Sequence, residues 1–460
     1  MRLKMDRAAR AFVPLAAMAL LMLAAVRTSA QDIKIAYEKF ALPNGLTVIV
    51  HEDHKAPIVA LNIWYHVGSK NEKPGKTGFA HLFEHLMFGG SENVKGRYID
   101  AMEHVGATDL NGTTNSDRTN YFEDVPTSAL DYALFLESDR MGHFYNTINK
   151  ETLDLQRGVV QNERRQSYEN RPYGLAEENI LERLYPTNHP YHWPVIGSMA
   201  DLQAATLEDV RQFFRTYYTP NNATLAIAGD ITARDARQLA ERYFGDIPRG
   251  PAVTRTPPPR VSVAGVGAVL EDRVQVPRVY DAWHTVKAFS ADDATLDVLA
   301  NVLAGGRSSR LYRRLVYERQ VATDVVAFQD GSRIDGKFEV YATARPGHDL
   351  GELQRVIDEE LQKLTDQGPT PREVERAQNT FEAQFLSRME RVGGFGGKAD
   401  QLNYYNYFVG TPDYFQQDLD RYRRVTPAAV QRAARTYLTG PHRVVLSVVP
   451  QGKPELAVKQ

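Results

Sequence analysis

The sequence predicts an α+β fold of two tandem homologous domains, each a mainly antiparallel sheet packed with helices, facing each other across a linker. Three observations predict this fold. Short sequence matches recur at a constant offset, strand-like runs mix with long helical stretches, and a proline-rich break divides the 460 residues. That length allows two or three domains, and the composition, 43% hydrophobic and 24% charged, is ordinary for a globular protein.

The duplication is visible as matching residues on either side of the break. Thr206, Val210 and Arg215-Thr216-Tyr217 recur at an offset of 220 as Thr426, Val430 and Arg435-Thr436-Tyr437. Near the start of each half, Glu52-Asp53, Pro57 and Trp64 match Glu271-Asp272, Pro277 and Trp283. These matches are short, but they keep one order and nearly one spacing, so we interpret the two halves as copies of one unit.

The elements of each half follow from hydrophobic runs and periodicity. Strands are predicted at residues 46–50, 59–65, 223–228, 338–343 and 444–449, and helices at 130–144, 152–168 and 350–364. Prolines between 248 and 259 predict an extended linker. The predicted organisation is a signal peptide (1–30), an N-terminal domain (31–247), the linker (248–261) and a C-terminal domain (262–460).

The N-terminus has the three parts of a secretory signal peptide. Basic residues are followed by the apolar stretch 11–26, and Thr28-Ser29-Ala30 offers a small-residue cleavage site. We expect cleavage near Ala30 and no stable membrane span afterwards, with an uncleaved N-terminal anchor as the alternative. The sequence has no cysteine, so an exported location such as a bacterial periplasm would involve no disulfide.

The charge of the mature chain argues against a nucleic-acid partner. Residues 1–30 contain five basic residues and one acidic residue, so removing them leaves 50 basic and 56 acidic residues, a net charge of −6. Nucleic-acid-binding domains are usually basic. Without cysteine, any metal ion must be held by histidine, aspartate or glutamate.

Residues 79–88 place His81, Glu84 and His85 inside an otherwise apolar run. On a helix, positions i and i+4 share one face, so His81 and His85 can hold one ion between their rings. Glu84 projects beside the same site. The spacing is the H-x-x-E-H signature of inverted zinc peptidases. Unpaired buried polar groups are rare, so the apolar context strengthens the interpretation.

The second half supplies an internal control for this motif. Aligning Gly89-Gly90 with Gly305-Gly306 places Asp297, Ala300 and Asn301 opposite His81, Glu84 and His85. The helix therefore recurs without the ligands. Packing of this fold does not need the His/Glu set, so chemistry explains the set better than architecture.

The chain resembles the pitrilysin/insulinase-type zinc peptidases, and in particular their two-domain members such as mitochondrial processing peptidase and bacterial relatives. The resemblance covers nearly the whole mature chain. It rests on Leu42-Pro43-Asn44-Gly45-Leu46, the helix with His81, Glu84 and His85, residues 111–123, and Asn162-Glu163-Arg164, all in order.

The resemblance implies a site and an activity. His81, His85 and Glu163 correspond to the ligands of one Zn²⁺ per chain, although an isolated helical glutamate such as Glu163 is otherwise usually a solvated surface residue. Glu84 corresponds to the general base, which takes a proton from a water molecule activated by zinc. Asn111 corresponds to a residue that contacts the substrate backbone, with an extended peptide adding a strand beside residues 108–113. The expected activity is endoproteolysis of peptides or unfolded segments.

Two positions depart from the family pattern. A second glutamate often lies seven residues before the third ligand, and here that residue is Gln156. An Arg/Tyr pair that binds substrate usually follows Ser308-Ser309-Arg310-Leu311, but Val316 and Thr323 occupy its positions. We therefore expect a heterodimer with a homologous peptidase-like subunit that supplies the pair.

Three alternatives remain open at the level of sequence. The chain could be a non-catalytic assembly or binding subunit of the same fold, although such a subunit would be expected to lose His81, Glu84, His85 or Glu163. A processing peptidase for a single precursor cannot be distinguished from a general peptide-degrading enzyme. Manganese or cobalt could occupy the ligands in place of zinc.

Overall fold

The computed structural model describes residues 32–254 and 257–459. The predicted signal peptide, residues 1–30, lies outside the described residues. Contacts between residues divide the chain into two units, Met1–Ile35 and Ala36–Gln460, and the fold below is that of the second unit. None of the described helices is both long enough and apolar enough to cross a bilayer.

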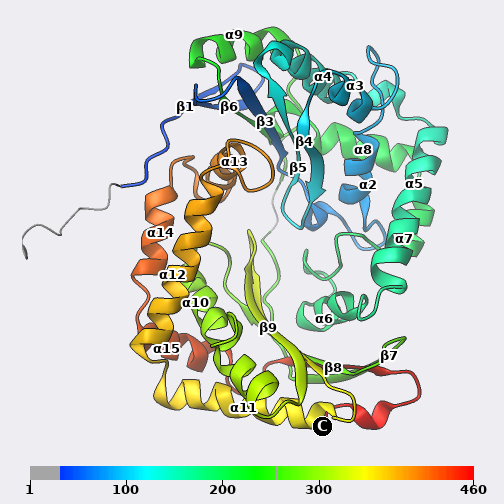
Figure 1. The fold of residues 1–460 in the computed structure, drawn as a ribbon. Helices are drawn as coiled ribbons and strands as arrows, with labels where there is room; N and C mark the ends of the chain where they lie inside the picture. The colour runs from blue at the N-terminus through cyan, green and yellow to red at the C-terminus, as the bar shows by residue number, and fades with distance from the viewer. Residues whose placement is uncertain (1–31, 255–256, 460) are drawn as a thin grey trace, which may run out of the picture. The chain divides into compact units, whose positions relative to one another are not determined.

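The first half contains a six-stranded sheet in the order β1-β2-β6-β3-β5-β4 (Figure 1). β2 and β6 are parallel, and every other neighbouring pair is antiparallel. Among the described strands, β4 pairs only with β5, so it forms an edge of this sheet. The strands are β1 (Glu38–Ala41), β2 (Thr47–Glu52), β3 (Ile58–Tyr65), β4 (Thr108–Thr114), β5 (Thr119–Pro126) and β6 (Ala223–Gly229).

The second half repeats this sheet without the first strand. Its order is β7-β11-β8-β10-β9, with β7 and β11 parallel and the other pairs antiparallel. Position by position, β7, β11, β8, β10 and β9 correspond to β2, β6, β3, β5 and β4. The strands are β7 (Val266–Asp272), β8 (Arg278–Thr285), β9 (Ala322–Gly331), β10 (Gly336–Ala344) and β11 (Val444–Pro450). The predicted α+β fold of two homologous, mainly antiparallel domains is confirmed.

Helices cover both sheets. Those of the first half are η1 (Ser69–Asn71), α2 (Phe79–Leu86), α3 (Tyr98–His104), η2 (Thr127–Ala129), α4 (Leu130–Gly142), η3 (Tyr145–Thr147), α5 (Lys150–Arg164), η4 (Arg165–Glu169), α6 (Ala176–Leu184), α7 (Met199–Ala204), α8 (Leu207–Tyr217), η5 (Pro220–Asn222) and α9 (Ala233–Phe244). Those of the second half are α10 (Asp293–Ala304), η6 (Tyr312–Glu318), α11 (Leu350–Gln367), α12 (Pro371–Arg388), α13 (Lys398–Val409), α14 (Phe415–Arg423), α15 (Pro427–Tyr437) and η7 (Pro454–Leu456). The predicted helix 152–168 is thus an α-helix that continues as the π-helical turn η4.

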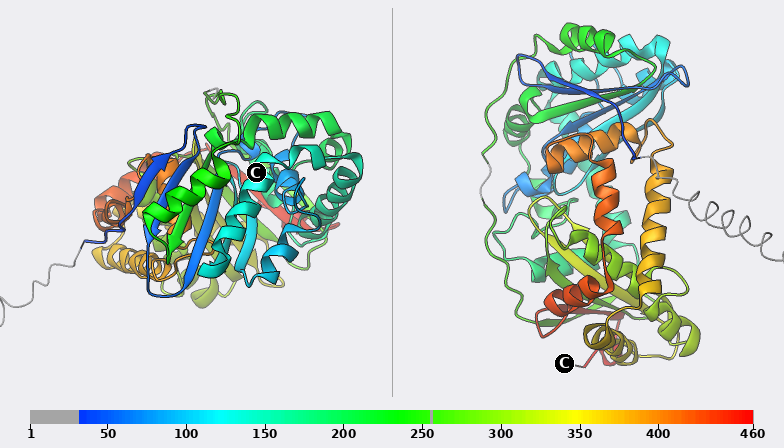
Figure 2. Two further views of the ribbon diagram at one scale, coloured as in Figure 1. Left: turned by 90° about the horizontal axis from the view of Figure 1, so that it is seen from above. Right: turned by 90° about the vertical axis from the view of Figure 1, so that its left-hand side faces the viewer.

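The connection between the halves lies between α9 and β7. Its described residues, 245–254 and 257–265, contain no helix or strand, and Figure 2 shows them following one side of the unit. Prolines explain the absence of regular structure, because proline lacks the N–H group that helices and inner strands require. This segment includes the predicted linker, 248–261.

One helix of each half packs against the sheet of the other half. α13 of the second half packs against β3 and β6, and α6 of the first half packs against β8 and β11 (Figure 1). Lys398, which begins α13, lies 220 residues beyond Glu178 of α6, so the two exchanged helices are equivalents. A shared apolar cluster joins Ile180 and Leu184 to Val444 and Leu446. The exchange makes residues 36–459 one interlocked unit.

α2 begins without a side-chain N-cap of its own. Gly78 occupies the N-cap position in the left-handed conformation, with φ of 85°. Glu72, a buried residue six positions earlier, accepts the N–H groups of Gly78 (3.0 Å) and Ala80 (2.7 Å). The side chain thereby satisfies two of the N–H groups that the start of a helix leaves unpaired. The apolar side chains of α2, among them Phe79, Leu82, Phe83 and Leu86, enter the first core.

Candidate metal centre

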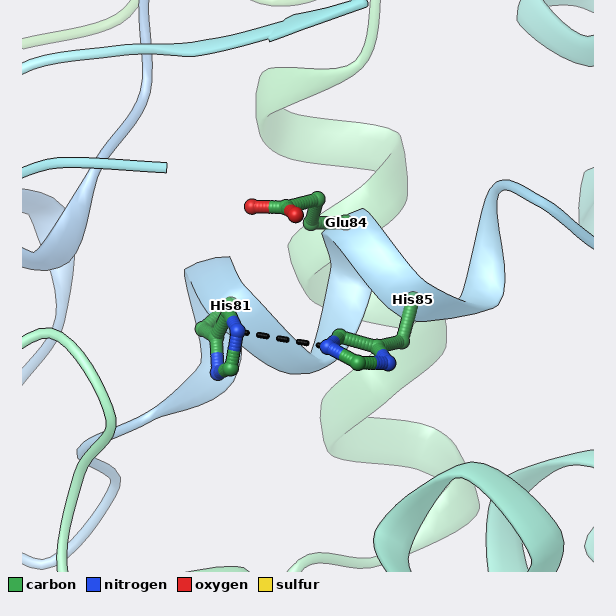
Figure 3. Close-up of side chains that lie close together, drawn as sticks. All are labelled: His81, Glu84 and His85. Atoms are coloured by element: carbon green, nitrogen blue, oxygen red, sulfur yellow. Dashed lines mark hydrogen bonds between the residues drawn. The ribbon is translucent and has the colours of Figure 1, made fainter. Parts of the chain in front are cut away.

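His81 and His85 face each other across one turn of α2, as their spacing predicts (Figure 3). Their Nε2 atoms are 3.2 Å apart. The two side chains are 11% and 22% exposed, so neither is freely solvated. Two imidazole nitrogens at this distance need either a shared proton or a cation between them.

Glu163 reaches the same point from α5, which packs beside α2. Its Oε2 lies 3.3 Å from Nε2 of His85 and 3.7 Å from Nε2 of His81. Asn149 caps α5, with its side chain accepting the N–H of Thr152. The structure therefore brings the three sequence-predicted ligands together from two helices.

The three atoms fit the geometry of a zinc site. Zinc bonds of about 2.0–2.1 Å in a tetrahedron hold ligand atoms about 3.3 Å apart. The observed separations of 3.2 and 3.3 Å match that edge length, and the third, 3.7 Å between His81 and Glu163, is slightly longer. Two imidazoles and one carboxylate also form a usual donor set for catalytic zinc, which keeps a fourth position open.

The electrostatics of the site favour metal binding. Burial, together with the neighbouring His85, lowers the pKa of His81 to about 4, despite the opposing effect of Glu163. His81 is then neutral at pH 7 and its nitrogen lone pair is available. A hydrogen bond with His85 lowers the pKa of Glu163, which keeps the carboxylate ionised. Deprotonated ligands are the forms that bind a metal.

Glu84 belongs to the same cluster but points differently. Ligand atoms of His81, Glu84 and His85 all lie within 4.8 Å of one another. In Figure 3 the Glu84 carboxylate projects away from the gap between the two rings. Glu163 has an oxygen closer to both imidazole nitrogens, so the distances favour Glu163 over Glu84 as a ligand. Burial raises the pKa of Glu84, and a hydrogen bond with Thr114 opposes the rise. A carboxyl group with a raised pKa near a metal site suits proton transfer.

A cavity of about 510 Å³ opens beside Glu84 and His85. Exposed Asn111 lines it from the free edge strand β4, and its Oδ1 accepts the N–H of Gly112 (2.9 Å). Gln156 of α5 lines the same cavity. The apolar part of the wall consists of Leu86, Phe88, Ile99, Phe144 and Leu155. An edge strand next to a cavity of this size can bind an extended peptide and one of its side chains.

The ligand-free half confirms that the helix packs without a metal site. In α10, Ala300 is buried and Asp297 accepts a hydrogen bond from the hydroxyl of Tyr422 (2.6 Å). Val316 lies in η6 against the second core, and Thr323 is exposed at the start of β9. Neither side chain can replace the guanidinium or the phenol of an Arg/Tyr pair.

Sequence reasoning missed the residues that support the site. Glu72 caps α2 from an irregular segment, and Thr114, at the end of β4, lies close enough to Glu84 to oppose the rise in its pKa. Neither residue belongs to a spacing pattern, because Glu72 lies in an irregular segment just before α2 and Thr114 lies on a strand rather than on the helix of Glu84. The one usable signal was a glutamate between polar turn residues just before a helix without a capping side chain.

Comparison with protein families matches two models to the chain. Residues 47–193 match the model described as "Insulinase (Peptidase family M16)", and residues 204–381 match "Peptidase M16 inactive domain". The chain belongs to the insulinase family of peptidases, family M16. The first match contains His81, Glu84, His85 and Glu163, and the second covers most of the half that lacks them. The resemblance expected from the motifs is confirmed.

Relatives of this M16 chain include named proteases. It is similar to "Zinc protease PqqE" of Helicobacter pylori, with 29% identity over 84% of this chain and 87% of that protein. It is also similar to "Probable mitochondrial-processing peptidase subunit beta" of Arabidopsis thaliana, with 23% identity over 86% of this chain and 75% of that protein. The family is thus one of metallopeptidases.

Solved structures share the fold. A crystal structure of a protease from Helicobacter pylori has a TM-score of 0.80 and 25% identity, covering 91% of this chain and all of that one. A peptidase M16 inactive domain from Pseudomonas fluorescens has a TM-score of 0.79 at 19% identity, covering 92% and 99%, and shows likeness of fold alone. The two-domain architecture therefore recurs across the full length of both neighbours.

Proposed function

We propose that this chain is a zinc-dependent endopeptidase that hydrolyses peptides or unfolded segments. The observation that carries the proposal is the convergence of His81, His85 and Glu163 at tetrahedral-edge distances, with Glu84 on the same helix. Membership of a metallopeptidase family and similarity to proteins named zinc proteases support it. In the proposal His81, His85 and Glu163 hold one zinc ion.

Glu84 acts as the general base. When bound, zinc supplies a Lewis acid that polarises the scissile carbonyl and lets water lose a proton near neutral pH. Glu84 removes a proton from the attacking water and delivers it to the leaving amine as the C–N bond breaks. Burial of the side chain raises its pKa, which suits a group that first accepts and then donates a proton.

β4 aligns the substrate. Its unpaired edge offers backbone N–H and C=O groups to an extended peptide, and Asn111 adds a side-chain amide at the same edge. The adjacent cavity takes one apolar side chain of the peptide, since its wall is largely aliphatic and aromatic. A short peptide or an unfolded segment can adopt this extended form without disrupting a fold, so we propose these as the substrates.

We propose that the active form is a heterodimer with a homologous M16 subunit. Val316 and Thr323 stand where an Arg/Tyr pair would stabilise the developing oxyanion, so the partner supplies that pair. The similar Arabidopsis protein is named as a subunit, which is consistent with assembly from related chains.

The sequence further supports export to a periplasm after cleavage near Ala30.

The test combines metal analysis with peptide cleavage. The purified mature chain should contain one zinc per chain, and a quenched fluorescent peptide should be cleaved when a homologous subunit carrying the Arg/Tyr pair is added. A chelator should abolish cleavage and zinc should restore it. Full activity of the lone chain would refute the heterodimer. Absence of zinc binding, or of chelator-sensitive cleavage by the pair, would favour a non-catalytic assembly subunit instead.

A further inference from the structure

Arg164 directly follows Glu163 at the end of α5, and its side chain is buried against residues outside that helix. One guanidinium nitrogen donates to the carbonyl oxygen of Gly197 at 2.7 Å. The other terminal nitrogen donates to Glu178 of α6 at 2.8 Å. A buried guanidinium held by two partners fixes the end of α5 in position and direction.

Gly197 carries this contact onward to α2. A Cβ atom on Gly197 would lie 2.3 Å from the nitrogen of Gly78, so the two backbones touch. Gly197 also has a φ of 72°, a conformation that favours glycine. Gly78 is the N-cap of α2, and His81 follows three residues later. A short path therefore joins Glu163 to His81 through Arg164, Gly197 and Gly78.

The ring of His81 depends on its helix for its position. Its Nδ1 atom is buried and has no hydrogen-bond partner within the part of the chain that the structure describes. Metal-binding histidines are usually oriented by a hydrogen bond at the second ring nitrogen. Without that bond, the distance between His81 and Glu163 follows from how α2 and α5 are held against each other.

The second half separates packing contacts from contacts that belong to the metal half. Arg157 of α5 donates to the carbonyls of Leu202 (3.0 Å) and Ala205 (2.6 Å). When α5 and α12 are aligned on their N-caps, Asn149 and Thr370, Gln378 takes the place of Arg157. Gln378 donates to the carbonyls of Tyr422 (2.9 Å) and Val425 (3.0 Å). These two acceptors lie 220 residues after Leu202 and Ala205, so the contact is the same in both halves.

The contact of Arg164 does not recur. Phe385 takes its place on α12, and this side chain is buried beside the ring of Phe415. The half without metal ligands thus keeps the contact made by Arg157 and replaces the one made by Arg164 with apolar packing. A feature that is absent from the half without metal ligands is not required for packing of this fold. The Arg164 contact is such a feature, so we interpret it as serving the metal centre.

We propose that Arg164 is a positioning residue for the zinc site, which sets Glu163 relative to His81 and His85 through the Gly197–Gly78 contact. This inference rests on the proposed function, because it assumes that the three side chains bind zinc. Arg164 touches neither the ion nor the substrate in this proposal. It acts by holding two helices at the separation that the ligand atoms require.

The decisive experiment is a pair of identical substitutions on one helix. Arg164→Gln and Arg157→Gln each replace a guanidinium that donates to a backbone carbonyl with an amide. The apo forms are titrated with zinc against a chromophoric chelator, so that affinity is read without activity. We expect the zinc Kd to rise about 10–100-fold for Arg164→Gln, as for other outer partners of metal ligands. For Arg157→Gln it should stay within about threefold, since the second half already uses glutamine there.

A second pair of variants keeps the inference testable if Arg164→Gln fails to fold. Gly197→Ala would push against Gly78, whereas Gly347→Ala introduces a side chain at a similar φ of 89° with open space around it. Only Gly197→Ala should weaken zinc binding and alter the visible spectrum of the cobalt-loaded protein. If Arg164→Gln and Gly197→Ala both bind zinc as their controls do, Arg164 is merely structural and the inference is wrong. If the unaltered protein binds no zinc, the proposed function fails instead.

Discussion

The indole N–H of Trp64 donates to Oδ1 of Asp400 at 2.9 Å, and this bond joins β3 of the first sheet to α13 of the second half. Asn62 and Asn120 donate to the same oxygen at 3.3 and 3.2 Å. The other oxygen of Asp400 accepts the N–H of Gly396, in the glycine-rich segment before α13. One buried carboxylate therefore fastens the exchanged helix to the sheet that carries the candidate site.

Removing this carboxylate should destabilise the whole unit. Asp400→Ala leaves three buried side-chain donors without their acceptor, which should lower the free energy of unfolding by about 2–4 kcal/mol. Asp400→Asn keeps one acceptor oxygen and should cost less. Urea unfolding measures both changes, with Asp366→Ala on the exposed face of α11 as the control. Equal stability of Asp400→Ala and the control would show that the exchange of α13 contributes little.

Glu84→Gln should separate metal binding from catalysis. The amide preserves the shape of the side chain but cannot accept a proton at neutral pH, so peptide cleavage should fall by at least about 100-fold. Zinc content should stay at the level of the unaltered chain, because Glu84 is not a proposed ligand. Metal analysis and kcat/KM are measured on the same preparation, in the presence of the partner subunit. Unchanged cleavage would remove Glu84 from the mechanism.

Glu163→Gln should weaken zinc binding itself. A neutral amide is a poor zinc ligand, so the zinc Kd should rise by more than the roughly 10–100-fold that follows loss of an outer partner. Glu151→Gln provides a matched control, since Glu151 is an exposed residue in the first turn of the same helix. Competition with a chelator gives both constants. Equal affinities would mean that Glu163 is not the third ligand.

Restoring the Arg/Tyr pair should reduce the need for a partner. The double substitution V316R/T323Y places the two missing donors in the second half, and one oxyanion donor is typically worth about 100–1,000-fold in kcat. We expect cleavage by the lone chain to rise by at least about tenfold. The gain should be smaller than the full effect of an oxyanion donor, because Val316 packs against the core and the larger side chain must be accommodated. V316K/T323F has similar bulk without the guanidinium and hydroxyl. The same gain from that variant would argue against the pair.

Stability should depend on pH through Asp297, the counterpart of His81. Burial and the neighbouring Asp293 raise the pKa of Asp297 to about 7, against 3.8 for an ordinary aspartate. The folded protein therefore holds a proton that the unfolded chain releases, and the stability from this group is present below pH 4 and lost as pH rises to 7. Between pH 5 and pH 8 the free energy of unfolding should therefore fall by about 1–3 kcal/mol less in Asp297→Asn than in the unaltered protein. Urea unfolding at pH 5 and at pH 8 measures this difference in stability, with Asp366→Asn as the control. If Asp297→Asn leaves the pH dependence unchanged, the raised pKa does not belong to Asp297.

The sequence by itself determined the local part of the site. His81 and His85 share a helix face because four residues make about one turn, and a spacing of this kind can be recognised without tertiary information. The duplication was equally visible, since matching residues keep one offset. Glu163 needed the family resemblance, because 78 residues separate it from His85 and no local pattern marks it.

Only the tertiary structure decided how the two helices are held together. The contacts of Arg164 with Gly197 and of Asp400 with Trp64 of β3 join residues far apart in the chain. The contact of Glu72 with α2 is closer in sequence, but it too depends on how the chain turns before the helix rather than on periodicity. The reciprocal exchange of α6 and α13 is also absent from the sequence pattern, because an amphipathic helix specifies that it must cover an apolar face but not which sheet provides it.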